Sequence, residues 1–157
     1  MNEIQSWKQE SVILNSKLIL DNFQHWIGKP LLEITGTPEE MAKALFEAPH
    51  PVFCHGTEAD PIYNYGNRKA MELWEVSWEE LTQMPSRYSA PPMDREERLQ
   101  LLKTVTENGY IKQGKGIRIS RTGQRFLISD FIVWNLLSDR GNYCGQAATF
   151  SKWKKID

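Results

Sequence analysis

The sequence predicts an α+β domain, with helices covering one face of a five-stranded antiparallel sheet and further helices at the N-terminus. Two short apolar or aromatic runs, Val52–His55 and Ile62–Tyr65, flank a turn rich in Gly, Asp and Pro. Capped helical segments follow, and three long strand-like segments separated by polar turns close the chain. Because helix and sheet curvature rarely match, we expect a pocket between the helices and the sheet.

Length and composition favour one globular domain of 157 residues. We divide it into an N-terminal amphipathic helix over 1–28 and the main domain over 29–157. No window reaches the roughly 18 apolar residues that a membrane span needs, and residues 1–10 lack the apolar centre of a signal peptide. We therefore expect a cytoplasmic protein without membrane contact.

Charge is unevenly distributed although the whole chain carries a net charge of only −1. Residues 1–102 carry a net charge of −7, and residues 103–157 carry +6. One interpretation is that the two halves complement each other and solvate their own surfaces. The alternative is an anionic ligand or partner on the C-terminal strands.

The segment 11–27 has the apolar spacing of an amphipathic helix, with Ser11 as its expected N-cap and Gly28 and Pro30 as stop signals. This helix could cover the domain's own sheet or form a dimer seam.

Further helices are marked by capping residues. Thr37 precedes a Pro and two acids, Asn67 precedes an apolar helical run, and Ser77 stands three residues before Glu80 in a capping box. Asp94 is the expected cap of a helix that Gly109 ends.

The last third of the chain changes to strand character. We expect strands over 110–120, 125–137 and 143–153, with hairpin turns between them. The small residues at 145–148 would let another element approach the last strand closely.

The segments HGTEADPIYNYGNRKAMELWE, SWEELTQMPSR and YCGQAATFSKW strongly resemble the stand-alone bacterial, notably cyanobacterial, proteins of the MEKHLA-domain family. The segment ENGYIKQGKGIRISRTGQRFLISDFIVWNLL also resembles the C-terminal domain of plant class III homeodomain–leucine zipper factors. The resemblance covers about residues 15–153. It implies a PAS-like fold and a sensor of small molecules or redox state, and no functional residue is carried over.

In a PAS-like sheet the first strand lies beside the last, so Cys54 and Cys144 would occupy neighbouring strands. Neighbouring strands can satisfy the Cα separation of a disulfide, which is about 4.4–6.8 Å. A redox pair is one interpretation, and two inert thiols in a reduced compartment are the other.

Cofactors of PAS-like domains leave signals that this sequence largely lacks. There is no Cys between residues 55 and 143, which disfavours a covalent flavin adduct, and the expected helix 94–108 contains no His for haem. His50, Cys54 and His55 do not match a metal-site spacing, so no metal is expected. A non-covalent small molecule or flavin stays open.

Aromatic residues gather in the elements that would enclose a pocket, although they could equally be core filling. Mid-strand amides and basic side chains could add polar contacts to a ligand, including a carboxylate or phosphate. The candidate pocket residues are Phe53, Tyr63, Tyr65, Trp74, Trp78, Arg118, Arg125, Trp134, Asn135 and Gln146.

These observations favour a non-catalytic sensory, ligand-binding and protein-interaction module. Its partner would be an unknown signalling protein or a second copy, with no direct DNA binding. The alternatives are a ligand-free dimerisation scaffold and a small enzyme using the same cavity. The sequence shows no recognisable acid–base pair, and this argues against the enzyme alternative.

Overall fold

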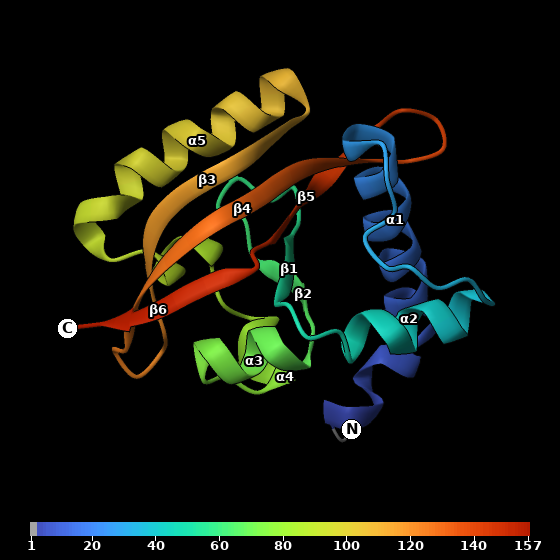
Figure 1. Cartoon of the computed structure of the whole chain (residues 1–157), viewed down its shortest axis with the longest axis horizontal. Coiled ribbons are helices and arrows are strands. Elements are labelled where there is room, and N and C mark those ends of the chain that lie inside the picture. The colour runs from blue at the N-terminus through green and yellow to red at the C-terminus, as the bar shows by residue number, and fades with distance from the viewer. Residues whose placement is uncertain (1–2) are drawn as a thin grey trace.

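The computed structural model describes residues 3–157, with side chains from Ser6 onward, and confirms the α+β class. An antiparallel sheet forms the centre, with helices on both faces (Figure 1). The α-helices are α1 (Glu10–Ile27), α2 (Pro38–Phe46), α3 (Arg68–Trp74), α4 (Trp78–Leu81) and α5 (Arg95–Asn108), and the short 3-10 helices are η1 (Glu3–Lys8), η2 (Ser86–Ser89) and η3 (Pro92–Asp94).

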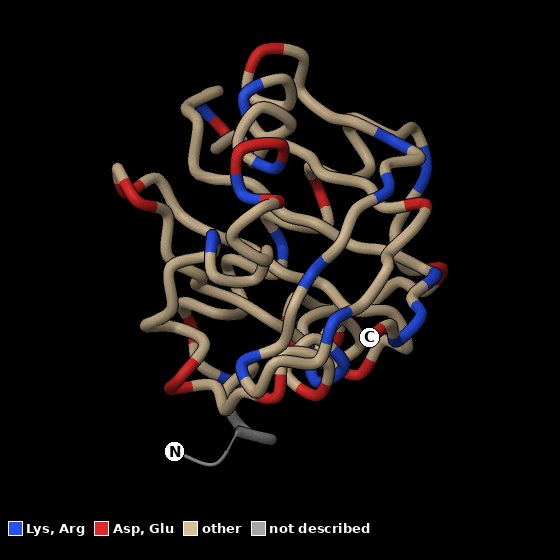
Figure 2. The backbone as a smooth tube through the Cα atoms, turned by 90° about the vertical axis from the view of Figure 1, so that its left-hand side faces the viewer, with Lys and Arg blue, Asp and Glu red and all other residues tan. Residues whose placement is uncertain are grey.

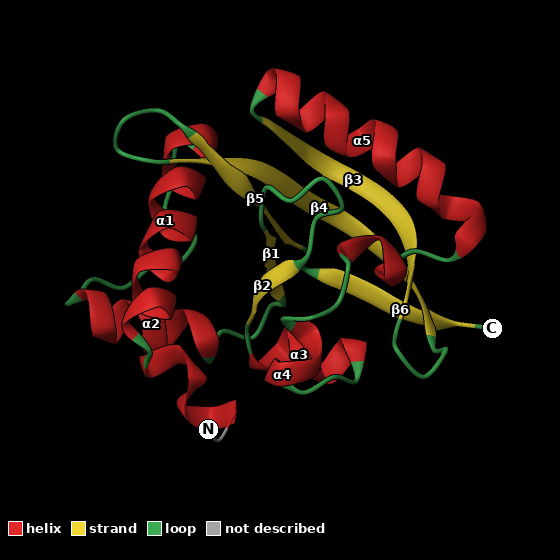
Figure 3. Cartoon of the chain, turned by 180° about the vertical axis from the view of Figure 1, so that it is seen from behind, coloured by secondary structure: helices red, strands yellow, loops and turns green. Residues whose placement is uncertain are grey.

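The strands follow the order β2-β1-β5-β4-β3 across the sheet, and β6 pairs with β4. In Figure 3 the sheet is seen from behind, with α5 running alongside β3. The strands are β1 (Val52–His55), β2 (Tyr63–Gly66), β3 (Tyr110–Ile119), β4 (Arg125–Leu137), β5 (Tyr143–Thr149) and β6 (Lys152–Ile156).

The predicted single last strand is in fact two strands, β5 and β6, and this corrects the expectation of one strand over 143–153. The pairing of β4 with β5 ends at Ile132 and Thr149, and its pairing with β6 begins at Ser129 and Lys152. Between them the backbone of Asp130 has a φ of 52°, which interrupts the regular ladder. The side chain of Phe150 turns into the core at this break.

Helix α1 packs on the face of the sheet opposite α3 and α5. Its buried residues include Ile19 and Phe23, and they share a core cluster with Trp134 and Leu136 of β4. The indole of Trp134 donates a hydrogen bond to the carbonyl of Ile19 at 3.2 Å. The helix therefore covers the domain's own sheet, with Leu14 left 62% exposed on its outer side.

The helix-capping signals are mostly confirmed. Thr37 and Ser77 form capping boxes with Glu40 and Glu80, and Gly28 ends α1 in the left-handed conformation. Two expectations were wrong. Helix α1 begins at Glu10 after Gln9, not after Ser11, and Asp94 makes no capping bond. The η3 turn places the backbone of Asp94 in a helical conformation, whereas a capping residue is normally extended.

Charge complementarity between the halves is visible where Arg121 of the β3–β4 turn pairs with Glu80 at 3.4 Å. Basic and acidic positions are interleaved along the chain (Figure 2). Among residues 3–157, no helix is both long enough and apolar enough to cross a bilayer.

Asn67 joins three elements through one fully buried amide. Its Oδ1 accepts from the backbone N–H groups of Val52 and Ala70, each at 3.0 Å. Its Nδ2 donates to the carbonyls of Leu45 at 3.1 Å and His50 at 2.8 Å. The side chain thus caps α3 and fixes the end of α2 and the start of β1.

We predict that Asn67→Ala lowers the free energy of unfolding by about 3 kcal/mol, because it leaves several buried backbone groups without partners. Urea denaturation of the variant and the parent measures this difference. Asn64→Ala is the matched control, since Asn64 is exposed and the one side-chain hydrogen bond it makes among the described residues is to the partly exposed Asn15. The control should lose less than about 1 kcal/mol. Equal losses in the two variants would contradict the role given to Asn67.

Candidate functional site

An internal cavity of about 60 Å³ lies between the sheet and the helices α3, η2 and α5. Its walls combine aromatic, aliphatic, amide, imidazole and guanidinium groups. The lining residues are Phe53, Cys54, His55, Tyr63, Trp74, Ser89, Arg98, Leu101, Leu102, Arg118, Ile128, Phe131, Val133, Gln146, Ala147, Ala148 and Phe150.

Stacked aromatic rings form one wall of the cavity. Phe53 lies 4.5 Å from Trp74 between ring centroids, and both rings lie within 6.3 Å of Phe150. The indole of Trp74 donates to the hydroxyl of Tyr63 at 3.3 Å, and Tyr63 donates to Oγ of Ser89 at 3.0 Å. These bonds satisfy the polar tips of the buried aromatics and hold the wall in one arrangement.

Gln146 and Asn135 hold the C-terminal end of α5 against the sheet. Nε2 of Gln146 lies 3.1 Å from the carbonyl of Leu102, from Oγ1 of Thr106 and from Oδ1 of Asn135. Nδ2 of Asn135 donates to the carbonyl of Val105 at 2.9 Å. Asn135 therefore gives the last turn of α5 an additional hydrogen-bond donor from the sheet, while Gln146 also lines the cavity.

His55 brings an unsatisfied polar atom to the cavity. Its Nδ1 lies 3.1 Å from the carbonyl of Gly56, an arrangement that requires the proton on Nδ1. The Nε2 atom is buried and has no hydrogen-bond partner among the described residues. Burial lowers the pKa of His55, so the neutral ring presents Nε2 as an acceptor.

Two arginines line the cavity from opposite elements, Arg98 from α5 and Arg118 from β3. Burial lowers the pKa of both guanidiniums, and the neighbouring charge of Arg98 helps to bring the pKa of Arg118 to about 10. Arg118 donates to the carbonyl of Ile117 at 2.7 Å and lies over the ring of Phe131. A guanidinium group stays protonated in proteins near neutral pH, so both arginines place a positive charge on the cavity wall.

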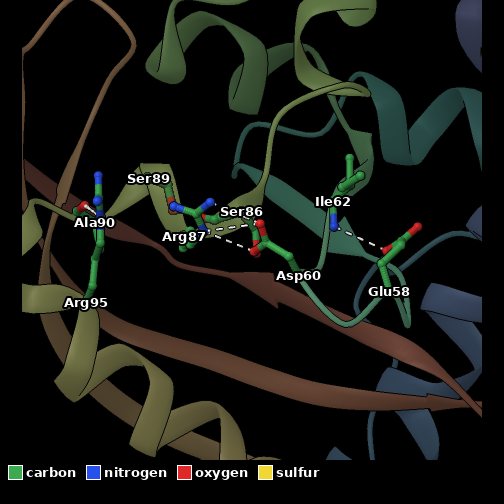
Figure 4. Close-up of polar contacts among 8 residues, drawn as sticks. All are labelled: Glu58, Asp60, Ile62, Ser86, Arg87, Ser89, Ala90 and Arg95. Atoms are coloured by element: carbon green, nitrogen blue, oxygen red, sulfur yellow. Dashed lines mark hydrogen bonds and ion pairs between the residues drawn. The ribbon is translucent and has the colours of Figure 1, made fainter.

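The η2 wall of the cavity is tied to the β1–β2 turn by contacts at the surface. Arg87 makes a two-pronged ion pair with Asp60, with Nε–Oδ1 and Nη2–Oδ2 distances of 3.0 Å (Figure 4). Nε of Arg95 donates to the carbonyl of Ala90 at 3.1 Å. Arg87 and Arg95 both lie over the ring of Tyr88, at 4.4 and 5.2 Å from its centroid.

Some of the predicted pocket residues line the cavity and others do not. Phe53, Tyr63, Trp74, Arg118 and Gln146 line it. Tyr65 and Trp134 belong instead to the core cluster under α1, with Trp78 packed against it; Asn135 anchors α5, and Arg125 stands on the part of β4 that pairs with β6.

The split between Tyr63 and Tyr65 has a local cause. Residues two apart on a regular strand share a face, but the β1–β2 register shifts between Cys54 and His55. Tyr65 therefore pairs with Cys54 on the α1 side, while Tyr63 pairs with His55 on the cavity side. The sequence prediction missed this irregularity.

Besides several apolar lining residues, sequence reasoning missed three with polar or charged side chains, His55, Ser89 and Arg98. A signal for Arg98 exists, because it stands three and four residues before Leu101 and Leu102, which line the same cavity. For Ser89, in a segment read as irregular, no comparable periodicity exists.

Cys54 and Cys144 lie on the neighbouring strands β1 and β5, and both thiols are free. The register places Cys54 opposite Ala147, three residues from Cys144. Direct pairing would need a shift of the strands, given the short Cα separation of a disulfide. Burial also raises the pKa of Cys54 to about 12, so this thiol stays protonated. No group of three or more His, Cys, Asp or Glu residues suited to a metal occurs within residues 3–157.

We predict that one thiol, that of Cys144, reacts with Ellman's reagent in the native protein at pH 8, because Cys54 is buried and protonated. The second thiol should react only after denaturation. Cys144→Ser should abolish the native reaction, and Cys54→Ser should leave it unchanged. A native protein whose thiols react together, or whose mass shows a bridge after mild oxidation, would contradict this prediction.

The sequence profile of the MEKHLA domain matches residues 14–155. No curated protein matches the chain significantly. Among solved structures, the PAS domain of a protein from Colwellia psychrerythraea is similar, with a TM-score of 0.63 and 16% identity over 75% of this chain and 95% of that one.

Two photoreceptor structures are also similar. The LOV domain of the blue-light photoreceptor Aureochrome1 has a TM-score of 0.57 at 19% identity, covering 78% of this chain and 87% of that one. A variant of the fungal photoreceptor VVD has a TM-score of 0.58 at 11% identity, covering 85% and 93%. At these identities the likeness shows the PAS-like fold alone.

The cavity does not fit a flavin in its present form. Its volume of about 60 Å³ is well below the roughly 300–1,000 Å³ of typical cofactor pockets. A three-ring group would need α5 and η2 to move away from the sheet.

Proposed function

We propose that this protein, which belongs to the MEKHLA domain family, is a sensory module that binds a small molecule in the cavity between α5 and the sheet. The PAS-like fold supports this role. The observation that carries it is the cavity itself, which combines a fixed aromatic wall with one buried imidazole nitrogen, Nε2 of His55, that has no hydrogen-bond partner among the described residues. Such a combination is typical of a ligand site.

A non-catalytic role fits the chemistry of the cavity lining. The residues that line it include no carboxylate to pair with His55 as acid and base. Its one thiol, Cys54, has a raised pKa and is a poor nucleophile. We therefore propose binding without turnover.

A chain of hydrogen bonds offers a route from the cavity to the opposite face. Gln146 lines the cavity and donates to Asn135. The carbonyl of Asn135 accepts from the indole of Trp26 on α1 at 2.9 Å. We propose that a ligand touching Gln146 shifts α1, and that α1 passes the change to a partner protein.

The partner would meet the outer side of α1. Leu14 is 62% exposed there, and Ile34, in the loop before α2, is 51% exposed. The same surface is the basis of the alternative function, a dimerisation scaffold without a ligand.

Native mass spectrometry of the freshly purified protein tests the proposal against the alternative. We expect a non-covalent adduct that disappears from the denatured mass, because unfolding separates the residues that line the site. A clean dimer without adduct would favour the scaffold and contradict the sensory proposal.

Ala148→Val should fill the cavity. Ala148 lines it from β5, a strand position that tolerates a β-branched side chain. Two added methyl groups, each worth about 0.8 kcal/mol when buried, should hold the unfolding free energy at or above that of the parent. The adduct seen by mass spectrometry should be lost. Retention of the same adduct by a folded Ala148→Val protein would place the ligand elsewhere.

A further inference from the structure

We propose that the ligand of this cavity is a small carboxylate, held between the guanidinium groups of Arg98 and Arg118. The inference rests on the proposed ligand-binding function and specifies the chemistry of that ligand. It starts from an unusual feature of the cavity, two positive charges on its wall without a matching negative one.

The two arginines stand between two adjoining spaces in the protein. Both line the main cavity, and both also line a smaller space of about 20 Å³ between the N-terminal half of α5 and β3. Leu101 of α5 also lines both spaces. The guanidinium groups therefore lie where α5 meets β3, with the aromatic wall on their inner side.

Neither guanidinium takes part in an ion pair among the described residues. The arginines that do so are Arg68, Arg87 and Arg121, at the surface. The carboxylates of Asp94 and Glu97 line the smaller space and raise the pKa of Arg118, although within residues 3–157 no ion pair joins them to it. Their effect on the pKa of Arg118 is smaller than the opposing effects of burial and of Arg98.

Both arginines are partly buried, and a charge that loses hydration without gaining a counter-ion is unfavourable. Two like charges side by side add repulsion. An anion that enters between them removes both costs together. The planar guanidinium matches a carboxylate in two-pronged geometry, which favours this anion class.

The size and lining of the cavity restrict the rest of the ligand. An engineered apolar cavity of about 150 Å³ binds benzene, so a cavity of about 60 Å³ suits a smaller ligand, such as an aliphatic acid with on the order of two to four carbons. Ile128 and Phe131 supply apolar contacts for the chain. A hydroxyl on that chain could donate to Nε2 of His55, which lacks a partner.

The net charge of +6 over residues 103–157 allowed two interpretations, self-complementation and an anionic ligand. The Glu80–Arg121 pair supports the first at the surface. Arg118 supports the second inside the main cavity, whose lining contains Arg98 and no carboxylate.

The experiment measures thermal unfolding of the full chain with sodium acetate, propionate and butyrate. Propionamide and butyramide at matched sodium chloride are the neutral isosteres, and inorganic phosphate is the alternative anion. We expect the carboxylates to raise the midpoint by roughly 5–10 °C at a hundredfold excess over Kd. The amides and phosphate should leave the unfolding midpoint unchanged.

Variants identify the site. Arg98→Met and Arg118→Met should each weaken propionate binding at least about tenfold by calorimetry. In the ligand-free protein they should keep or raise the unfolding midpoint, because an unpaired buried charge is replaced by an apolar chain. This opposite response of binding and stability separates a ligand site from a structural role.

Lys103→Met and Lys112→Met are the matched controls, since they remove the same charge from exposed positions of α5 and β3. Both should bind propionate like the parent. Arg98→Lys should retain a weakened response, because it keeps the charge without the planar fork.

Equal stabilisation by amides and acids, or unchanged binding in both arginine variants, would overturn the carboxylate assignment. A preference for phosphate would overturn it as well. No response to any probe would also overturn it. The proposed sensory function is judged separately by the adduct in native mass spectrometry, so a neutral adduct would leave that function standing while this inference fails.

Discussion

The buried amide of Asn67 is the constraint on which the rest of this fold depends. It bonds to the end of α2, the start of β1 and the first turn of α3 at once. The short strand β1 lies between β2 and β5. Its position determines where Phe53 and His55 enter the cavity. A polar residue in the core is tolerated here because each of its hydrogen-bonding groups has a partner.

The sheet separates two hydrophobic cores that differ in how completely they are filled. The cluster under α1 is closed by large side chains such as Trp134 and Phe23, whose rings meet edge to face at 5.0 Å. The cavity side contains small residues of β5, such as Ala148, and leaves space between the rings. The close approach of β5 to β1 also needs Gly145, whose φ is 133° and whose added Cβ would lie 2.2 Å from the carbonyl of His55.

The sequence was most informative where structure depends on neighbours in the chain. The caps at Thr37, Asn67 and Ser77 need only residues three positions away. The family resemblance placed the first strand beside the last expected strand, and β1 does pair with β5. The cavity depends on contacts between distant segments, and there the prediction was partial. A register shift in β1–β2 sends Tyr65 to the opposite face from Tyr63. Arg98 of α5 and Arg118 of β3 line the same cavity. No local sequence pattern specifies that these two residues, from a helix and a strand, come together.

Helix α5 is held unequally along its length, and this determines how an occupied cavity would move it. Its C-terminal end is fixed by the buried amides of Asn135 and Gln146. Its N-terminal end is bonded through Arg95 to the carbonyl of Ala90, which follows η2. The η2 segment is in turn held by the exposed Asp60–Arg87 pair, and exposed ion pairs contribute only about 0–1 kcal/mol. Arg98 stands near this weaker end. An anion that draws Arg98 toward Arg118 would therefore rotate α5 about its fixed end, and the strain would reach Gln146, Asn135 and Trp26 through bonds that already exist.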